Sequence, residues 1–161
     1  MSESTADILT IIQCINRFGM AIDRRDWESF RTLFASEVSF DYSSIGEVAG
    51  VLTPDEVVAN ARKDLGGFKT TQHVITNHII EIEDSVAHCQ AHVRAMHYLP
   101  KEVESILEMG GYYEAEFIKE SRWLIKNWKF TLLWSQGNEQ LFEIAKKTAN
   151  EPYDSPIEKK S

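Results

Sequence analysis

The chain has 161 residues, the length of one ordinary domain, and its 43% hydrophobic and 26% charged residues are typical of a packed globular protein, not of a disordered or collagenous chain. Its formal net charge is -8, from 25 acidic and 17 basic residues. Because no Lys/Arg block is long enough to follow phosphates, nucleic-acid and membrane partners are not expected. The longest apolar runs are far shorter than the ~20 residues that a membrane helix needs.

The beginning of the chain, MSESTADILT, has neither a secretory nor a transit pattern, so we expect a cytoplasmic protein. Cys14 and Cys89 have no CxxC spacing and lie in patterns of regular structure, which favours reduced core thiols. We expect one domain over residues 1–149. A flexible tail is predicted over residues 150–161, where few residues are apolar.

The first predicted element is a long amphipathic helix over residues 6–22. Its apolar side chains recur at helical spacing: Ile8, Ile11, Ile12, Ile15, Phe18 and Ile22. At about 100° per residue, Asp23 falls at the edge of this apolar stripe. The pattern therefore predicts a carboxylate close to the core.

A short helix over residues 26–34 is predicted next, with Trp27 and Phe30 facing inward. Residues 38–44 follow as a strand, because apolar and polar residues alternate there with Tyr42 on the apolar face. The alternation indicates that one face of this strand is buried.

A third helix has a clear beginning. Thr53 is the expected N-cap, Pro54 occupies the first helical position, and Glu56 completes a capping box. We expect this helix to end near Gly66.

The remainder of the chain predicts long strands rich in β-branched and aromatic residues, over 70–83, 86–99, 111–125 and 128–136. Turns are expected at residues 84–85, around Pro100, and at residues 126–127. Helices followed by a long antiparallel meander predict an α+β domain whose helices pack on one face of a curved sheet. Residues 138–149 can form a short helix that either closes the mouth of this cone as a lid or packs outside it. If the helix is a lid, removing the residues after Gly137 should lower turnover more than stability.

Alternation along the second long strand separates its histidines. His97 lies on the face that is almost entirely apolar, whereas His88 and His92 lie on the other face. In the preceding strand, His73 and His78 fall on opposite faces that are equally apolar. Periodicity alone leaves open which of these two points inward.

An acid/base site without a cofactor is the sharpest functional hypothesis, built from Asp23, Tyr42, His73 and His97. A carboxylate beside an imidazole fixes its tautomer and raises its basicity, and a tyrosine can polarise a carbonyl oxygen. The alternative is that these are ordinary helix-end and core residues. The sequence has no HExxH motif, no Gly-x-Ser-x-Gly elbow and no nucleotide-binding loop, so neither a metal nor a nucleotide cofactor is expected.

Glu114 and Glu116 alternate in the third long strand with residues of the apolar face: Tyr113, Ala115 and Phe117. They form either a solvated acidic face or, if that face lines the cone, unusual neighbours of the histidines.

The segment AIDRRDWESFRTLFASEVSFDYSS, together with Thr71-Gln72-His73, the His97 strand and Trp128-Lys129-Phe130, resembles the scytalone dehydratase group of the SnoaL-like, nuclear-transport-factor-2-like (NTF2-like) superfamily. The resemblance implies a cone-shaped barrel, assembly as a trimer or possibly a dimer, an internal site, and no metal or organic cofactor. It also implies that Asp23 supports His73, that His97 completes the acid/base set, and that Tyr42 orients a carbonyl-polarising water. It favours His73 over His78 as the internal histidine.

The sequence departs from that family at two places. Ile22 replaces a second tyrosine, and Glu114 and Glu116 stand where small polar substrate contacts are expected. Ile22, Asn77, Glu114 and Glu116 are therefore the predicted substrate-binding residues.

The resemblance implies a dehydratase, isomerase or cyclase that acts on a small, apolar or aromatic, cyclic polyketide-type carbonyl compound in secondary metabolite biosynthesis. The alternative is a non-catalytic binding or assembly module on the same fold.

Overall fold

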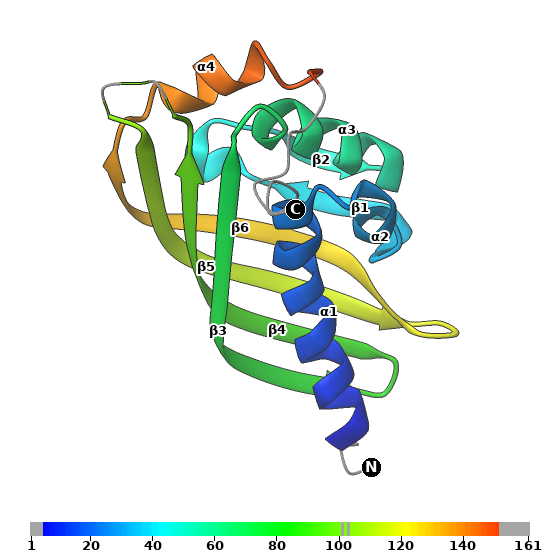
Figure 1. Ribbon diagram of the computed structural model, residues 1–161. Helices are drawn as coiled ribbons and strands as arrows, with labels where there is room; N and C mark the ends of the chain where they lie inside the picture. The colour runs from blue at the N-terminus through cyan, green and yellow to red at the C-terminus, as the bar shows by residue number, and fades with distance from the viewer. Residues whose placement is uncertain (1–4, 101, 103, 152–161) are drawn as a thin grey trace, which may run out of the picture.

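The computed structural model describes residues 5–100, 102 and 104–151, and it has helices packed on one strongly curved sheet (Figure 1). The elements are, in order, α1 (Thr5–Arg24), α2 (Trp27–Arg31), β1 (Phe34–Asp41), the 3-10 turn η1 (Ser43–Ile45), β2 (Ala49–Leu52), α3 (Pro54–Leu65), β3 (Thr70–Glu83), β4 (Val86–Tyr98), β5 (Ile106–Lys119), β6 (Trp123–Gly137) and α4 (Leu141–Lys146). The expected α+β class is confirmed. The tail predicted over 150–161 lies outside the described residues from residue 152 onward.

Within the described residues, the sheet has the strand order β2-β1-β6-β5-β4-β3, and every neighbouring pair except β1 and β6 is antiparallel. The strands β3 to β6 curve around α1, which packs against β3 and β6 (Figure 1). Helices α3 and α4 cover the other end of the concave face (Figure 1). This arrangement is the cone that the sequence predicts.

The amphipathic pattern of α1 explains its position. Ile11, Ile15, Phe18 and Ile22 are almost completely buried in the main core, together with Trp128 of β6. The predicted start of α3 is confirmed: Thr53 Oγ1 accepts from the Glu56 backbone N–H, and the Glu56 carboxylate accepts from the Thr53 N–H.

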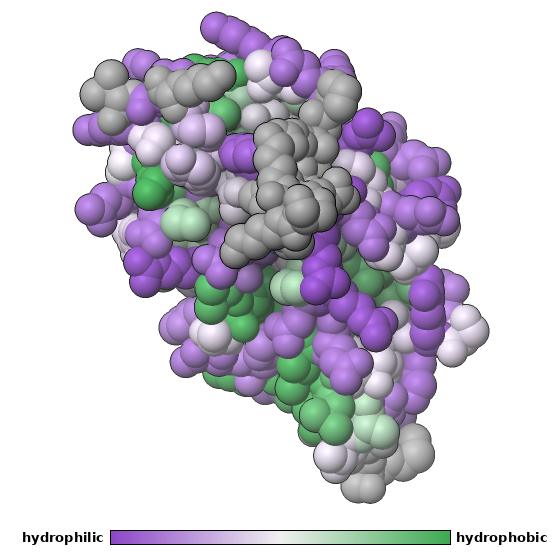
Figure 2. All heavy atoms as spheres, viewed as in Figure 1, coloured by the Kyte–Doolittle hydropathy of each residue, from purple (hydrophilic) through white to green (hydrophobic). Residues whose placement is uncertain are grey.

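None of the helices in the described ranges is long and apolar enough to cross a lipid bilayer. Figure 2 shows mostly hydrophilic side chains over α3 and α4, with apolar side chains interspersed lower on the same face. Exposed apolar residues include Leu9 and Met20 of α1 and Val74 and Ile79 of β3.

Two predicted boundaries near the second helix are wrong. The helix ends at Arg31 instead of residue 34, and β1 begins at Phe34, so that Tyr42 follows the strand instead of lying within it. The backbone N–H of Ile125 donates to the carbonyl of Leu33 at 2.9 Å. Pairing with β6 therefore draws this segment into the sheet, a tertiary contact that local propensity does not contain.

The turn predicted at residues 126–127 is also wrong, because the chain reverses at residues 120–122. Asn127 lies within β6, where its side-chain amide donates to Glu116 of β5 at 3.0 Å. Likewise, β5 begins before Gly111, because Gly110 continues the strand beneath the Trp134 indole, which a Cβ at Gly110 would overlap. Asn127 and Gly110 therefore make contacts between neighbouring strands instead of forming turns.

A β-bulge in β3 settles the ambiguity between its two apolar faces. The register with β4 shifts between Thr76 and Ile79, and Asn77 has a left-handed φ of 59°. Because the bulge exchanges the two faces, Ile75 before it and Ile80 after it both pack against the main core. His73, two residues before Ile75, therefore faces inward. Strict alternation would have placed it on the face opposite Ile80.

Candidate active site

The centre of the site is a carboxylate–imidazole hydrogen bond between α1 and β3. The Asp23 Oδ1 atom lies 2.7 Å from His73 Nδ1, and Oδ2 accepts from the His73 backbone N–H at 2.8 Å. Only 5% of the His73 side chain and 14% of the Asp23 side chain are exposed. A Cβ on Gly19 would lie 2.9 Å from His73 Cβ, so glycine at that position lets α1 approach β3 this closely.

This geometry determines the tautomer of His73. An ionised carboxylate can only accept, so Nδ1 carries the proton that it donates to Asp23. In the neutral ring, Nε2 then keeps its lone pair, and His73 lines the internal cavity. The pair has the form of an oriented general base.

Thr71 and Arg25 hold Asp23 in place. The Thr71 hydroxyl, on a residue that is 3% exposed, donates to Asp23 Oδ1 at 3.0 Å and accepts from Arg25 Nη1 at 2.8 Å. Arg25 also donates to the carbonyls of Ile22 and Phe68, which joins the end of α1 to the start of β3. The two residues form a hydrogen-bonded support behind the carboxylate.

We predict that Thr71→Val lowers the free energy of unfolding by about 1–3 kcal/mol, because the near-isosteric change leaves buried partners of the hydroxyl without a hydrogen bond. Thr71→Ser, which keeps the hydroxyl, should recover most of this loss. Urea denaturation measures both variants. Equal stability of the valine variant and the wild type would contradict the support assigned to Thr71.

His97 is the second internal histidine. It is 3% exposed, and its Nδ1 lies 3.2 Å from the carbonyl oxygen of Leu107. Burial, and then the neighbouring His73, lower the pKa of His97 to about 3. Because a carbonyl only accepts, Nδ1 carries the proton of this neutral ring and Nε2 is an acceptor. The His73 and His97 ring centroids are 6.1 Å apart.

Tyr42 forms a hydroxyl cluster with a residue that sequence reasoning assigned only to an apolar face. Its Oη accepts from Trp128 Nε1 at 3.1 Å, and the Tyr113 hydroxyl is its second hydrogen-bond partner. Burial raises the pKa of both tyrosines. Because the indole N–H of Trp128 only donates, Tyr42 keeps its own O–H proton as a donor. Tyr113 thus places a second hydroxyl in the cavity, although Ile22 replaces the tyrosine that the resemblance leads one to expect.

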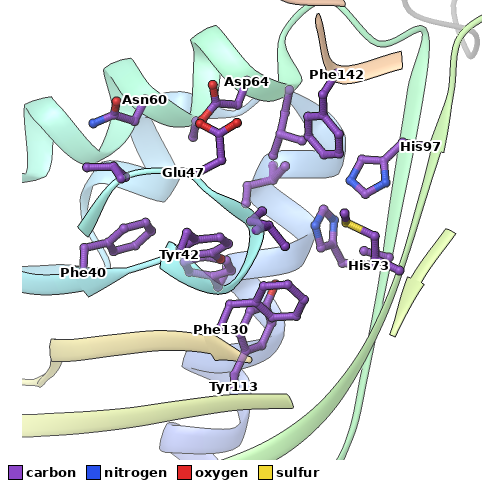
Figure 3. Close-up of a pocket in the computed structure, with 18 of the residues that line it drawn as sticks. Phe40, Tyr42, Glu47, Asn60, Asp64, His73, His97, Tyr113, Phe130 and Phe142 are labelled. Carbon is purple, nitrogen blue, oxygen red and sulfur yellow. The ribbon is translucent and has the colours of Figure 1, made fainter. Parts of the chain in front are cut away.

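These groups surround one mostly apolar cavity inside the cone (Figure 3). Aromatic and aliphatic side chains form most of its wall: Phe18, Ile22, Phe30, Phe40, Ile45, Val48, Ala61, Leu65, Ala95, Met109, Phe130 and Phe142. The polar lining consists of Tyr42, Tyr113, His73, His97, Glu47, Asn60 and Asp64. Such a cavity suits a small ring compound with a few polar substituents.

The structure places three of the predicted substrate-binding residues outside this cavity. Asn77 is an exposed residue at the β3 bulge, which turns it away from the interior. Glu114 and Glu116 lie on the opposite face of β5 from Tyr113 and line a separate polar groove that also contains His88 and Lys129. Glu114 and Glu116 thus lie on the solvated face of β5. Of the four predicted substrate-binding residues, Ile22 alone lines the cavity.

Helix α4 contributes to both the core and the cavity. Leu141 and Ala145 are fully buried against Phe68 and Leu107, while Phe142 lines the cavity with its ring centroid 5.0 Å from that of His97. Removing residues 138–149 would therefore strip a small core, so the truncation is expected to reduce stability as well as turnover. Helix α4 thus lines the cavity and also packs on the fold, and its action as a lid stays a prediction.

In the described ranges, no group of three or more His, Cys, Asp or Glu residues is arranged to hold a metal ion. The fold and site together define a class: small cone-shaped α+β proteins with an acid/base pair in an internal apolar cavity. A family model described as a SnoaL-like domain matches residues 3–130, and the chain belongs to this family. A search of curated protein sequences found no match.

Solved structures share the fold at low sequence identity. The Kfla4162 protein from Kribbella flavida is 24% identical, with a TM-score of 0.79 and coverage of 83% of this chain and 95% of its own. A candidate scytalone dehydratase from Novosphingobium aromaticivorans is 16% identical, with a TM-score of 0.71 and coverage of 97% and 96%. A hexachlorocyclohexane dehydrochlorinase (LinA) is 13% identical, with a TM-score of 0.72 and coverage of 83% and 89%. The resemblance to SnoaL-like proteins is confirmed.

Proposed function

We propose that this protein is a lyase that eliminates water from a small cyclic β-hydroxy ketone of the polyketide type, by acid/base chemistry without a cofactor. The observation that carries the proposal is the hydrogen-bonded Asp23–His73 pair, whose histidine lines the same cavity as Tyr42. Elimination of water moves protons and breaks a C–O bond without net oxidation or reduction. The side chains of the cavity can therefore supply every group that the reaction needs.

In the first step, His73 Nε2 removes the proton from the carbon next to the substrate carbonyl. The electron pair of the C–H bond moves onto the carbonyl oxygen and forms an enolate, and Asp23 stabilises the imidazolium. The free O–H of Tyr42 donates to the enolate oxygen directly or through a water. The high pKa of Tyr42 keeps this proton in place.

In the second step, the enolate re-forms the carbonyl and a carbon–carbon double bond while the β C–O bond breaks. His73 returns its proton to the departing hydroxide, so one water leaves and the enzyme is restored. The resemblance implies that His97 completes the acid/base set, but its lowered pKa and its Nδ1 contact with Leu107 leave it no proton to donate to this group near neutral pH. His97 instead accepts a hydrogen bond from the substrate and orients the leaving hydroxyl.

The comparisons support this class of reaction without identifying the substrate. One structural relative is named as a candidate scytalone dehydratase and another as a hexachlorocyclohexane dehydrochlorinase. Both names describe loss of a small molecule from adjacent carbons. Double-bond migration and cyclisation begin with the same proton removal and are the related outcomes of this machinery.

An absorbance assay tests the proposal with scytalone and a panel of related β-hydroxy ketones, without added metal or cofactor. The proposal predicts formation of a conjugated product. Tight binding of these compounds without turnover, with no effect of changing His73, would instead favour a non-catalytic binding module. Three further statements stay predictions from the sequence: a cytoplasmic location, a role in secondary metabolism, and assembly as a homotrimer. Light scattering tests the trimer.

We predict that Phe142→Ala raises the KM several-fold while lowering the free energy of unfolding by less than Leu141→Ala does. Phe142 is partly exposed and lines the cavity beside His97, whereas Leu141 is fully buried, and a buried Leu→Ala change costs about 2–5 kcal/mol. Steady-state kinetics and urea denaturation of the two variants measure this difference. An unchanged KM in the Phe142 variant would mean that α4 does not contact the substrate.

A further inference from the structure

One end of the cavity is acidic, and the mechanism above does not use it. Glu47, which precedes β2, and Asp64 of α3 both line the cavity beside Asn60. Figure 3 shows the Glu47 and Asp64 carboxylates close together beneath α3, at the end away from Tyr113 and Phe130. Acidic side chains in an otherwise apolar wall need partners.

Lys146 of α4 supplies hydrogen bonds to only part of this group. Its Nζ lies 2.8 Å from Glu47 Oε1 and 3.0 Å from Glu143 Oε1, but 3.8 Å from Asp64 Oδ1. Asp64 Oδ1 is buried and accepts no hydrogen bond from the described residues. Oδ1 is therefore a buried carboxylate oxygen without a hydrogen bond, held only in a longer ion pair with Lys146, and the Asp64 residue lines the cavity.

The surroundings of Asp64 agree with this incomplete pairing. Burial, and then the charge of Glu47, raise the pKa of Asp64 to about 6, against the opposing effect of Lys146. A carboxylate in this state gains from any additional donor that enters the cavity. An ether or alkyl group in the same place would offer the Asp64 carboxylate no donor, and an anion would be repelled by the two carboxylates.

We propose that Asp64, with Glu47 beside it, is a specificity-determining acceptor that selects substrates bearing a hydroxyl group remote from the carbon that loses its proton. This inference rests on the proposed function and narrows its substrate class to neutral cyclic ketones with a second, hydrogen-bond-donating hydroxyl. Binding of that hydroxyl at Asp64 orients the ring, so that the acidic C–H bond faces His73 and the carbonyl oxygen faces Tyr42.

Isothermal titration calorimetry with two unreactive probes tests the inference: a tetralone with a phenolic hydroxyl on its aromatic ring, and the methyl ether of that compound. Neither probe carries a β-hydroxyl group, so binding is measured apart from elimination. Because a hydrogen bond to a charged group contributes about 1.5–3 kcal/mol, the wild type should bind the phenol at least ~10-fold more tightly than the ether.

Asp64→Leu should reduce this preference to less than about 3-fold, and Asp64→Asn, which keeps an acceptor oxygen without the charge, should give an intermediate value. Glu143→Gln is the matched control, because Glu143 also pairs with Lys146 but its side chain is 76% exposed and outside the cavity lining. That variant should keep the wild-type preference. Circular dichroism verifies that each variant is folded.

The preference should also weaken below about pH 6, as Asp64 becomes protonated. The charged groups that act on Asp64 are Glu47 before β2, Lys63 of α3, and Glu143 and Lys146 of α4. The phenol stays neutral throughout this range, since phenolic hydroxyls ionise near pH 10.

Equal affinity of the wild type for the two probes, or no binding of either, would overturn the inference. So would a preference that survives in Asp64→Leu. A clear preference that disappears in Asp64→Leu, in a protein that dehydrates none of the β-hydroxy ketones, would instead support the acceptor site and contradict the proposed reaction. His73→Ala should keep the preference for the phenol, which separates recognition from proton removal.

Discussion

His73→Ala is expected to lower kcat for dehydration at least ~100-fold, because general base catalysis by a positioned side chain contributes about 10²–10⁴ to the rate. The variant loses the Nε2 atom that receives the substrate proton, whereas Tyr42 and the cavity remain. The KM should change much less than kcat, since the imidazole acts on the transition state. Steady-state absorbance kinetics with the best substrate of the panel measure both constants.

His88→Ala is the matched control for this experiment. His88 lies on the outer face of β4, with 55% of its side chain exposed and its Nδ1 atom 3.7 Å from Glu116 Oε2. Its removal should leave kcat within about 2-fold of the wild type, as surface changes far from a site usually have small effects. A His73→Ala variant with nearly wild-type kcat would contradict the assignment of His73 as the base.

Asp23→Asn is expected to reduce kcat by a similar factor, at least ~100-fold, without removing any ring atom from the site. An asparagine offers one acceptor oxygen and one donor amide in place of two acceptors. If its oxygen accepts from the His73 backbone N–H, its amide donates to Nδ1. The ring proton then moves to Nε2, where it blocks removal of the substrate proton.

Nitrogen NMR of the labelled protein distinguishes this explanation from a general structural loss, because it reports which ring nitrogen of His73 carries the proton. We expect the proton on Nδ1 in the wild type and on Nε2 in the asparagine variant. Asp7→Asn is a matched control, since Asp7 is another α1 carboxylate with two side-chain donors: it accepts from the buried Trp123 Nε1 at 2.7 Å and from the exposed Lys119. Full activity of Asp23→Asn, or an unchanged tautomer, would rule out the oriented-base mechanism.

Much of the fold was predictable because its signals are local and strong. The apolar stripe of α1, the capping box at Thr53 and the long runs of β3 and β4 depend on side chains within a few residues of each other. The placement of Asp23 at the edge of the stripe and of His97 on the apolar face follows from the same periodicities. The structure brings these two residues close to His73.

Other features were not predictable, because they depend on partners far along the chain. The bulge at Asn77 depends on the register of β3 against β4, so periodicity could not show that His73 before it and His78 after it lie on the same, inward side of the strand. The turn after β5 was misplaced because Asn127 satisfies its amide on Glu116, a partner from the neighbouring strand. Tyr113 was assigned to the apolar face correctly, but no local signal indicated that its hydroxyl meets that of Tyr42.

The amino-acid sequence by itself determined the fold class and the inward faces of α1 and β4, and with them the inward positions of Asp23 and His97. Hydrophobic periodicity is sufficient for this, because it decides which side chains leave water. Only the tertiary structure decided what those side chains do there. Hydrogen-bond partners and burial contributed by other elements set the tautomer of His73, the neutral state of His97 and the lack of a hydrogen bond at Asp64 Oδ1. Proton positions and charge states depend on the surroundings of a group in space, and those surroundings form only when the sheet closes around α1.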